Sequence, residues 1–269
     1  MATYVLSDIH GRLATFDRML EQLAFGDDDQ LFVLGDMVDR GSDPVGVLRH
    51  IRALPNARVL RGNHEELMLD ALNHPKDALA QDNWARNGGI STALGLSSCA
   101  DEERIELIDW ISSLPTYAYT FIDGRPYLFA HAGIRPGVGR VPSLWDEKGC
   151  EFYLASQSSE DLIWIREDFW SRPTGLIVQD GTGPVVIAGH TPVVFAEKLC
   201  DLPNNAAINE EGFAQILYCG RCEATGFVAD RIDIDCCGAA GAGFGRLGTL
   251  RLDDGAEFYE AVRDGELFS

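Results

Sequence analysis

Hydrophobic positions near the start of the chain follow two different spacings. Short continuous apolar runs at residues 3–6, 30–34 and 57–60 predict buried strands. Between them, residues 12–24 and 44–54 carry apolar side chains three and four positions apart, which is typical of amphipathic helices. A further helical pattern follows the third strand. Strands that alternate with helices form parallel sheets, so this part of the chain predicts a β-α-β-α-β unit.

The pattern changes after this unit. Residues 76–114 are helical in character and predict a cap-like segment. Two β-like runs at 117–122 and 125–130 are joined by Asp-Gly, which predicts a hairpin. From about residue 184 the segments are again short and β-like, whereas 140–183 has no readable periodicity. The whole predicts an α/β (α+β) protein with two sheets and helices outside them.

Composition narrows the class of protein. A chain of 269 residues without repeats or linkers predicts a single domain over residues 1–269, in which 196–226 is a divergent or inserted segment. There are 42 acidic against 22 basic residues, a net charge of −20, which argues against nucleic-acid and anionic-membrane partners. No apolar run approaches about 20 residues, and the start of the chain lacks the pattern of a signal peptide. We therefore expect a cytoplasmic protein.

The seven cysteines are irregularly spaced, which favours reduced thiols over a disulfide framework. Cys219 and Cys222 form a CxxC pair, and Cys236 and Cys237 follow. These four could hold a structural zinc ion or be buried and loop thiols. Adjacent residues in a strand point to opposite faces, which makes joint ligation by Cys236 and Cys237 awkward.

Polar residues recur where the predicted strands end. After a strand come, in chain order, Asp8 and His10; Asp36, Asp39 and Arg40; Arg61, Asn63, His64 and Glu65; His131; and His190. Ligands of open parallel sheets bind beyond the carboxyl ends of the strands, so we expect these side chains to meet in one crevice. Glu65 and Glu66 are better explained as helix-starting carboxylates than as ligands, because they favour the helix dipole.

Six of these residues are plausible metal ligands: Asp8, His10, Asp36, Asn63, His131 and His190. Carboxylate, imidazole and amide oxygen together suit Mn²⁺, Fe²⁺ or Zn²⁺. Six ligands are too many for one open site and suit two ions that share a bridging carboxylate. Two such ions about 3.5–4 Å apart can clamp both oxygens of an in-line phosphoryl displacement.

The five motifs DIHG, GDMVDRG, RGNHE, HAG and GHT, in this order, resemble those of the calcineurin-like metallophosphoesterases. More narrowly they are similar to the PPP-type serine/threonine protein phosphatases of the bacterial and phage branch. The resemblance spans about residues 8–190, and NWARNGG at 83–89 also resembles that branch. It implies a sandwich of two mixed β-sheets flanked by helices. The usual glycine before the first Asp is Ser7 here, which we expect to be tolerated if its φ is negative.

The resemblance also implies roles for individual residues. Asp8 and His10 would hold a first metal, Asp36 would bridge, and Asn63, His131 and His190 would hold a second. His64, oriented by Asp39, would protonate the leaving oxygen. The arginines that bind phosphate would be Arg40, Arg61 and Arg166, the last of which lies in LIWIRED. Arg166 could instead be an exposed helix residue that pairs with Asp161 or Glu167.

The resemblance predicts a metal-dependent phosphomonoester hydrolase that uses two divalent ions, with Mn²⁺ as the expected metal and Fe or Zn as alternatives. As a serine/threonine, or dual-specificity, protein phosphatase it would act on a phosphoprotein or phosphopeptide partner. The alternative within the superfamily is a dinucleoside-tetraphosphate or other nucleotide phosphohydrolase. Arg61 and Glu65 favour the protein phosphatase, and the acidic chain suits a polyanionic dinucleotide less well. A catalytically dead scaffold is disfavoured because all six ligand positions are intact.

Overall fold

The computed structural model describes residues 1–266 and contains two five-stranded sheets. The first has the order β10-β9-β1-β2-β3. Its strands are β1 (Thr3–Leu6), β2 (Gln30–Val33), β3 (Ala57–Val59), β9 (Arg246–Arg251) and β10 (Glu257–Ala261). Strands β1, β2 and β3 run parallel, as the alternating pattern predicts, while β9 pairs antiparallel with β1 and with β10.

The second sheet has the order β4-β5-β6-β8-β7. Its strands are β4 (Tyr117–Ile122), β5 (Arg125–Ala130), β6 (Val185–Ala188), β7 (Leu217–Cys219) and β8 (Arg231–Asp233). β4 and β5 form the predicted hairpin, and β5, β6 and β8 are parallel neighbours. Both sheets are therefore mixed, and the predicted α/β (α+β) architecture of two mixed sheets flanked by helices is confirmed.

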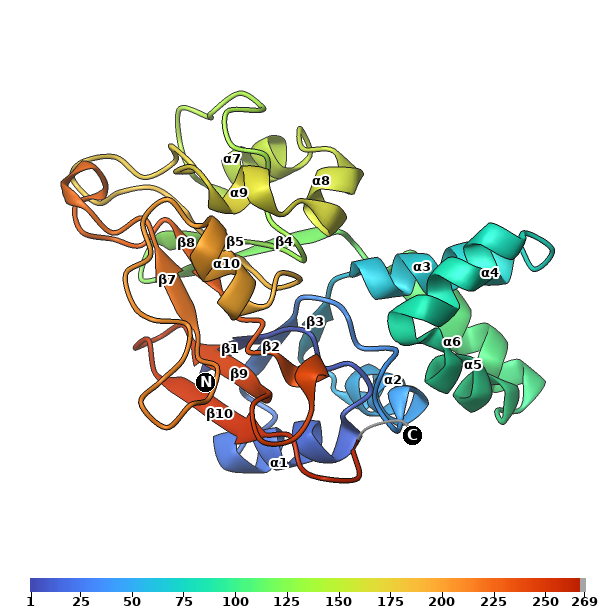
Figure 1. Cartoon of the computed structure of the whole chain (residues 1–269). Helices are drawn as coiled ribbons and strands as arrows, with labels where there is room; N and C mark the ends of the chain where they lie inside the picture. Colours follow the sequence, from blue (N-terminus) through green and yellow to red (C-terminus); the bar gives the residue numbers. More distant parts are fainter. Residues whose placement is uncertain (267–269) are drawn as a thin grey trace.

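Helices cover the outer faces of both sheets (Figure 1). The α-helices are α1 (Leu13–Leu23), α2 (Pro44–Ala53), α3 (Asn63–Asn73), α4 (Ala78–Trp84), α5 (Ile90–Ser97), α6 (Asp101–Ser113), α7 (Glu147–Leu154), α8 (Ser159–Trp164), α9 (Glu167–Trp170) and α10 (Val193–Leu199). One π-helical turn, η1 (Ala85–Gly89), joins α4 to α5, and two 3-10 turns are η2 (Glu223–Thr225) and η3 (Gly238–Ala240). The stretch 140–183, whose pattern was unreadable, contains α7, α8 and α9.

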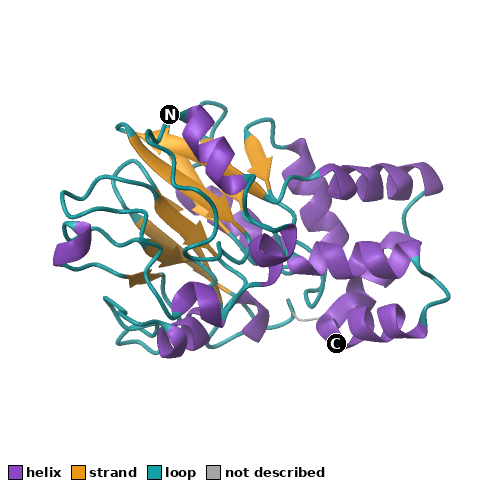
Figure 2. Cartoon of the chain, turned by 90° about the horizontal axis from the view of Figure 1, so that it is seen from above, coloured by secondary structure: helices purple, strands orange, loops and turns teal. Residues whose placement is uncertain are grey.

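Helices α3 to α6 gather on one side of the sheets (Figure 2). They include the segment 76–114, which the sequence predicts to be helical. Among the described residues 1–266, no helix has both the length and the apolar character needed to cross a membrane.

Alternation along the strands divides the core into two hydrophobic clusters. Val5 and Phe32 point into the cluster that the second sheet shares, where Phe32 packs against Phe129 with ring centroids 4.5 Å apart. Their neighbours Leu6 and Leu31 point to the opposite face, toward α1, α2 and the helices beyond. A strand with both faces covered must be apolar throughout, which is why β1 and β2 are continuous hydrophobic runs.

Candidate active site

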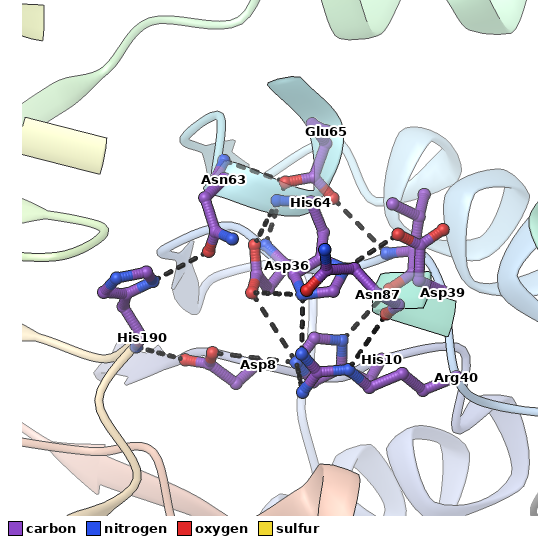
Figure 3. A network of polar contacts seen from close by, with 12 residues as sticks. Asp8, His10, Asp36, Asp39, Arg40, Asn63, His64, Glu65, Asn87 and His190 are labelled. Carbon is purple, nitrogen blue, oxygen red and sulfur yellow. Dashed lines mark hydrogen bonds and ion pairs between the residues drawn. The ribbon is translucent and has the colours of Figure 1, made fainter. Parts of the chain in front are cut away.

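The loops that follow β1 and β2 are bonded to each other through their backbones. Asp8 N donates to Gly35 O at 3.2 Å, and His10 N donates to Asp36 O at 2.9 Å. These bonds continue the parallel pairing past the ends of the strands. They bring the side chains of Asp8, His10 and Asp36 together, and all three are buried (Figure 3).

The backbone of this site lies largely in the left-handed region. Ten non-glycine residues of the described chain have positive φ, and six of them are predicted site residues: Asp8, His10, Asp36, Asp39, Arg40 and His190, with φ from 47° to 70°. Such conformations cost free energy and persist where the surroundings enforce them. Ser7 is not among the residues with positive φ, so the condition on its backbone is met.

Glu65 is the main support of the loop after β2. Its carboxylate accepts from Asp36 N at 2.9 Å, Met37 N at 2.8 Å and Gly62 N at 2.8 Å. The expected helix-starting carboxylate therefore also positions Asp36. A Cβ at Gly62 would lie 2.3 Å from Asp36 Oδ1, so only glycine permits this approach.

One set of candidate ligand atoms converges from both sheets. Asn63 Oδ1 lies 2.9 Å from His131 Nε2 and 2.7 Å from His190 Nδ1. Asp36 Oδ1 lies 3.3 Å from the same His131 nitrogen. Asn63 begins α3, while His131 and His190 follow β5 and β6. The structure thus brings together the four residues predicted for the bridge and the second metal.

A second set shares the other oxygen of Asp36. Asp36 Oδ2 lies 3.6 Å from His10 Nε2, which is 3.9 Å from Asp8 Oδ1. The other oxygen of Asp8 accepts from His190 N at 3.0 Å, which ties the two sets together. Two groups of nitrogen and oxygen atoms that share one carboxylate fit two divalent cations. His64 also lies close enough to His10 and Asp36 for these three side chains to hold a metal ion together.

Protonation favours metal binding. Burial lowers the pKa of His10, His131 and His190, so their imidazoles are held in the neutral form that ligates metals. Burial also raises the pKa of Asp36 well above its usual range, because a carboxylate here has little solvent to stabilise its charge. Cations at this position would supply that stabilisation.

His64 and Asp39 form a hydrogen-bonded pair beside the ligands. His64 Nδ1 lies 2.7 Å from Asp39 Oδ2, so Nε2 faces the cavity. Asp39 Oδ1 also accepts from Thr92 Oγ1 at 2.6 Å and from Trp84 Nε1 at 3.1 Å, which fixes the carboxylate. The NWARNGG segment therefore acts on the site through Trp84, whose role sequence reasoning did not assign.

The three predicted phosphate-binding arginines take different positions. Arg40 Nη2 lies 2.8 Å from His64 Nε2 inside the cavity, and Arg166 Nη1 donates to His190 O at 3.0 Å. Asp161, one of the alternative partners of Arg166, pairs with Arg135 instead. Arg61 instead pairs with Glu66 at 3.0 Å and donates to Ser112 O at 3.1 Å.

These side chains surround a cavity of about 270 Å³. Arg40 and Arg166 line it, whereas Arg61 does not. Five lining residues were not predicted: Asn87, Trp164, Pro192, Phe195 and Asp235. Asp235 is buried, and burial raises its pKa well above its usual range, with Asp8 as a further cause. Asp235 could have been predicted from the sequence, because it follows a strand and is followed three residues later by a glycine, as Asp8 is.

The four cysteines considered for zinc do not converge. All seven cysteines are free, and within residues 1–266 no cysteine belongs to a group of side chains that could hold a metal ion. Cys219, Cys236 and Cys237 are buried and Cys222 is half-buried. The structure therefore favours the buried and loop thiols.

The family model of the calcineurin-like phosphoesterases matches residues 1–220. The chain belongs to the calcineurin-like phosphoesterases. The match covers every motif on which the resemblance rested, and members of this family bind a dinuclear divalent metal centre. In the described part of this phosphoesterase, two groups of side chains could hold a metal ion: His10, Asp36 and His64, and Asp36, His131 and His190.

Two curated relatives of this phosphoesterase carry the same name. The protein of Glaesserella parasuis serovar 5 is 34% identical over 165 residues, which are 61% of this chain and 56% of that protein. The protein of Vibrio campbellii is 30% identical over 182 residues, 65% of this chain and 60% of that protein. Both are named symmetrical bis(5'-nucleosyl)-tetraphosphatases. The match thus spans somewhat more than half the length of each.

Solved structures share the fold of this phosphoesterase. A putative diadenosine tetraphosphatase superposes with a TM-score of 0.54 at 19% identity, covering 98% of this chain and 94% of that chain. A serine/threonine phosphatase of Saccharomyces cerevisiae, similar to human PP5, gives 0.53 at 16% identity, covering 100% and 82%. At these identities both likenesses show the fold alone.

The predicted phosphoprotein partner is wrong. The curated relatives are named for dinucleoside tetraphosphates rather than phosphoproteins. The residues used to choose between the two classes do not report on the substrate. Arg61 is engaged outside the cavity, and Glu65 is occupied by backbone amides. The net charge of −20 describes the whole chain and gives no sign of the two arginines, Arg40 and Arg166, that line the cavity.

Proposed function

We propose that this phosphoesterase hydrolyses nucleotide phosphoanhydrides and that a symmetrical dinucleoside tetraphosphate is its substrate. The observation that carries the chemistry is the sharing of Asp36 by two groups of ligand atoms beside the Asp39–His64 pair. The substrate class follows from the relatives, which are named for this reaction. Both supports are independent of net charge.

The proposed metal ligands are Asp8, His10, Asp36, Asn63, His131 and His190, with Mn²⁺ as the first expectation. When bound, two divalent ions supply Lewis acidity toward phosphoryl oxygens and lower the pKa of water enough for it to react at neutral pH. The burial of the ligand side chains keeps bulk water away from the reacting phosphate.

In the structure His64 Nε2 accepts from Arg40 Nη2, and in this mechanism it carries a proton for the leaving oxygen once Arg40 binds the phosphate instead. Asp39 accepts from Nδ1, which fixes the tautomer and stabilises the imidazolium. Arg40, within 2.8 Å of that nitrogen, binds the phosphate from which the leaving oxygen departs. Arg166 approaches from the opposite sheet and binds a second phosphate oxygen.

The test is a substrate profile with the metal content measured on the same sample. Purified protein with Mn²⁺ should convert diadenosine tetraphosphate to ADP, lose the activity with chelator, and leave phosphopeptides intact. His64→Asn should lower kcat by about 100-fold or more, as expected for loss of a proton donor. His74→Asn is the matched control, since the His74 side chain is 61% exposed and remote from the cavity.

Turnover of p-nitrophenyl phosphate without any turnover of dinucleoside tetraphosphates would contradict the proposed substrate and leave the chemistry standing. Full activity of His64→Asn on every substrate would contradict the chemistry itself.

A further inference from the structure

Two exposed aromatic side chains stand at the metal-binding cavity and take no part in the proposed chemistry. Trp164 is 41% exposed and Phe195 is 56% exposed. Among the exposed large hydrophobic side chains of residues 1–266, these two line the cavity that holds Asp8, Asp36 and His190. We call Trp164 and Phe195 the aromatic pair.

The pair is held by the same segments that supply the second metal-ligand set. Trp164 ends α8, and its ring lies edge-on to His190, with centroids 6.1 Å apart. Two residues later, Arg166 donates to His190 O. Phe195 belongs to α10, which starts just after His190 and packs against α9. The aromatic pair is therefore positioned relative to the reacting phosphate by short stretches of chain.

The size of the cavity decides which part of a substrate meets the pair. Ligand pockets that enclose a drug-sized molecule measure about 300–1,000 Å³. At about 270 Å³, lined mainly by charged and polar groups, this cavity suits phosphates and leaves a nucleoside outside. The remainder of a nucleotide must then extend through the mouth, where the aromatic rings are exposed.

We propose that the aromatic pair is the platform on which a nucleobase of the substrate stacks. A base presents a flat π-face to such rings and needs no particular hydrogen-bond pattern. Stacking is also indifferent to charge, which matters in a chain of net charge −20. Lys198 Nζ lies over one face of the Phe195 ring, 5.6 Å from its centre, and adds a cation at the platform for a polyphosphate, while a base would stack on the other face. This inference rests on the proposed function, because it assigns a site for the nucleoside part of that substrate.

The experiment compares a substrate with bases and one without. Trp164→Ala and Phe195→Ala are assayed on diadenosine tetraphosphate and on inorganic tetraphosphate at the same Mn²⁺ concentration. We expect kcat/KM for the dinucleotide to fall at least about fivefold, mainly through KM, because base stacking on an aromatic side chain is lost. Hydrolysis of inorganic tetraphosphate should stay within about twofold, and Trp164→Tyr should recover most of the loss.

Phe227→Ala is the matched control. Phe227 is 66% exposed and does not line the cavity, so its removal should leave both substrates unaffected. Calorimetric binding of ADP and of pyrophosphate to the metal-loaded proteins gives the same comparison without turnover. In this assay the two alanine variants should bind ADP at least about fivefold more weakly than the wild type and should bind pyrophosphate with unchanged affinity.

Equal losses on both substrates, or ADP binding equal to that of the wild type, would overturn the platform. A wild-type protein that turns over inorganic tetraphosphate but no dinucleoside tetraphosphate would overturn the proposed function instead. In that case the binding of ADP against pyrophosphate still decides whether the aromatic pair contacts a base.

Discussion

The two sheets contribute unequal walls to the cavity. The first-sheet wall comprises the loops after β1, β2 and β3, which bring Asp8, His10, Asp36, Asn63 and the Asp39–His64 pair. Its backbone amides are bonded between loops and to Glu65, and its side chains are buried. This wall is held firmly by hydrogen bonds, and it supplies candidate metal ligands and the proposed proton donor.

The second-sheet wall is mixed in character. His131 and His190 complete the metal ligands, but Arg166 reaches in from the segment between α8 and α9, and the aromatic pair is exposed. In the proposed function the first wall supplies the proton donor and the second wall adds the exposed aromatic pair, while each wall contributes metal ligands and one phosphate-binding arginine, Arg40 and Arg166.

The largest effect is expected where the two walls meet. Asp36→Asn removes the carboxylate shared by both ligand groups, so kcat should fall by about 1,000-fold or more on every substrate. Elemental analysis should find less than two equivalents of metal. A variant that lost activity on only one substrate would show that Asp36 belongs to recognition and would break this comparison.

Arg166→Ala sharpens the comparison on the other wall. Loss of a charged hydrogen bond to phosphate is worth roughly 1.5–3 kcal/mol, so kcat/KM should fall about 10- to 100-fold. Arg61→Ala is its control. Because Arg61 pairs with Glu66 outside the cavity, kcat/KM should stay within about twofold. Steady-state kinetics on diadenosine tetraphosphate separate the two, and a greater loss from Arg61→Ala would reverse the assignment.

Glu65→Gln tests the rigidity of the first-sheet wall. A glutamine amide cannot accept from all the backbone donors that Glu65 satisfies, so the free energy of unfolding should fall by about 2 kcal/mol. Glu66→Gln alters a surface pair and should change it by less than about 0.5 kcal/mol. Urea denaturation of the metal-free proteins measures both, and equal values would mean that Glu65 supports nothing.

A smaller effect concerns the metal-free protein. Because the folded-state pKa of Asp36 is raised above 3.8, its charge costs no stability below pH 3.8 and the full amount once the pH exceeds the folded value. In chelator at pH 8, Asp36→Asn should therefore melt a few °C above the wild type. The gain should shrink at pH 5 and reverse when Mn²⁺ is added. Calorimetric melting curves test this, and a variant that melts lower under all conditions would contradict it.

Much of the first-sheet wall was predictable because its signals are local. Apolar runs that end in DIHG, GDMVDRG and RGNHE identify both the strands and the residues beyond them. The direction of Arg61 was not predictable, since it depends on Glu66 and the end of α6. Nor was the aromatic pair, because Trp164 and Phe195 lie in short helices whose pattern looks the same whether a ring is buried or exposed.

The substrate class was misjudged for a related reason. The motifs encode metal and proton chemistry, which protein phosphatases and nucleotide hydrolases of this fold have in common. The aromatic pair, which we propose to contact the nucleobase, lies outside those motifs.

The position of β9 has a consequence for how the chain folds. Strand β1 lies between β2, which follows it closely in the chain, and β9, which begins at Arg246. During synthesis β1 remains an edge strand, with unpaired amides and carbonyls, until some 240 further residues have been made. The Asp8 carboxylate likewise cannot accept its hydrogen bond from the backbone amide of His190 until that residue, 182 positions later, has been made. Metal loading should thus wait until His190 has been made, and chains truncated before Arg246 should aggregate through β1 rather than accumulate as stable fragments.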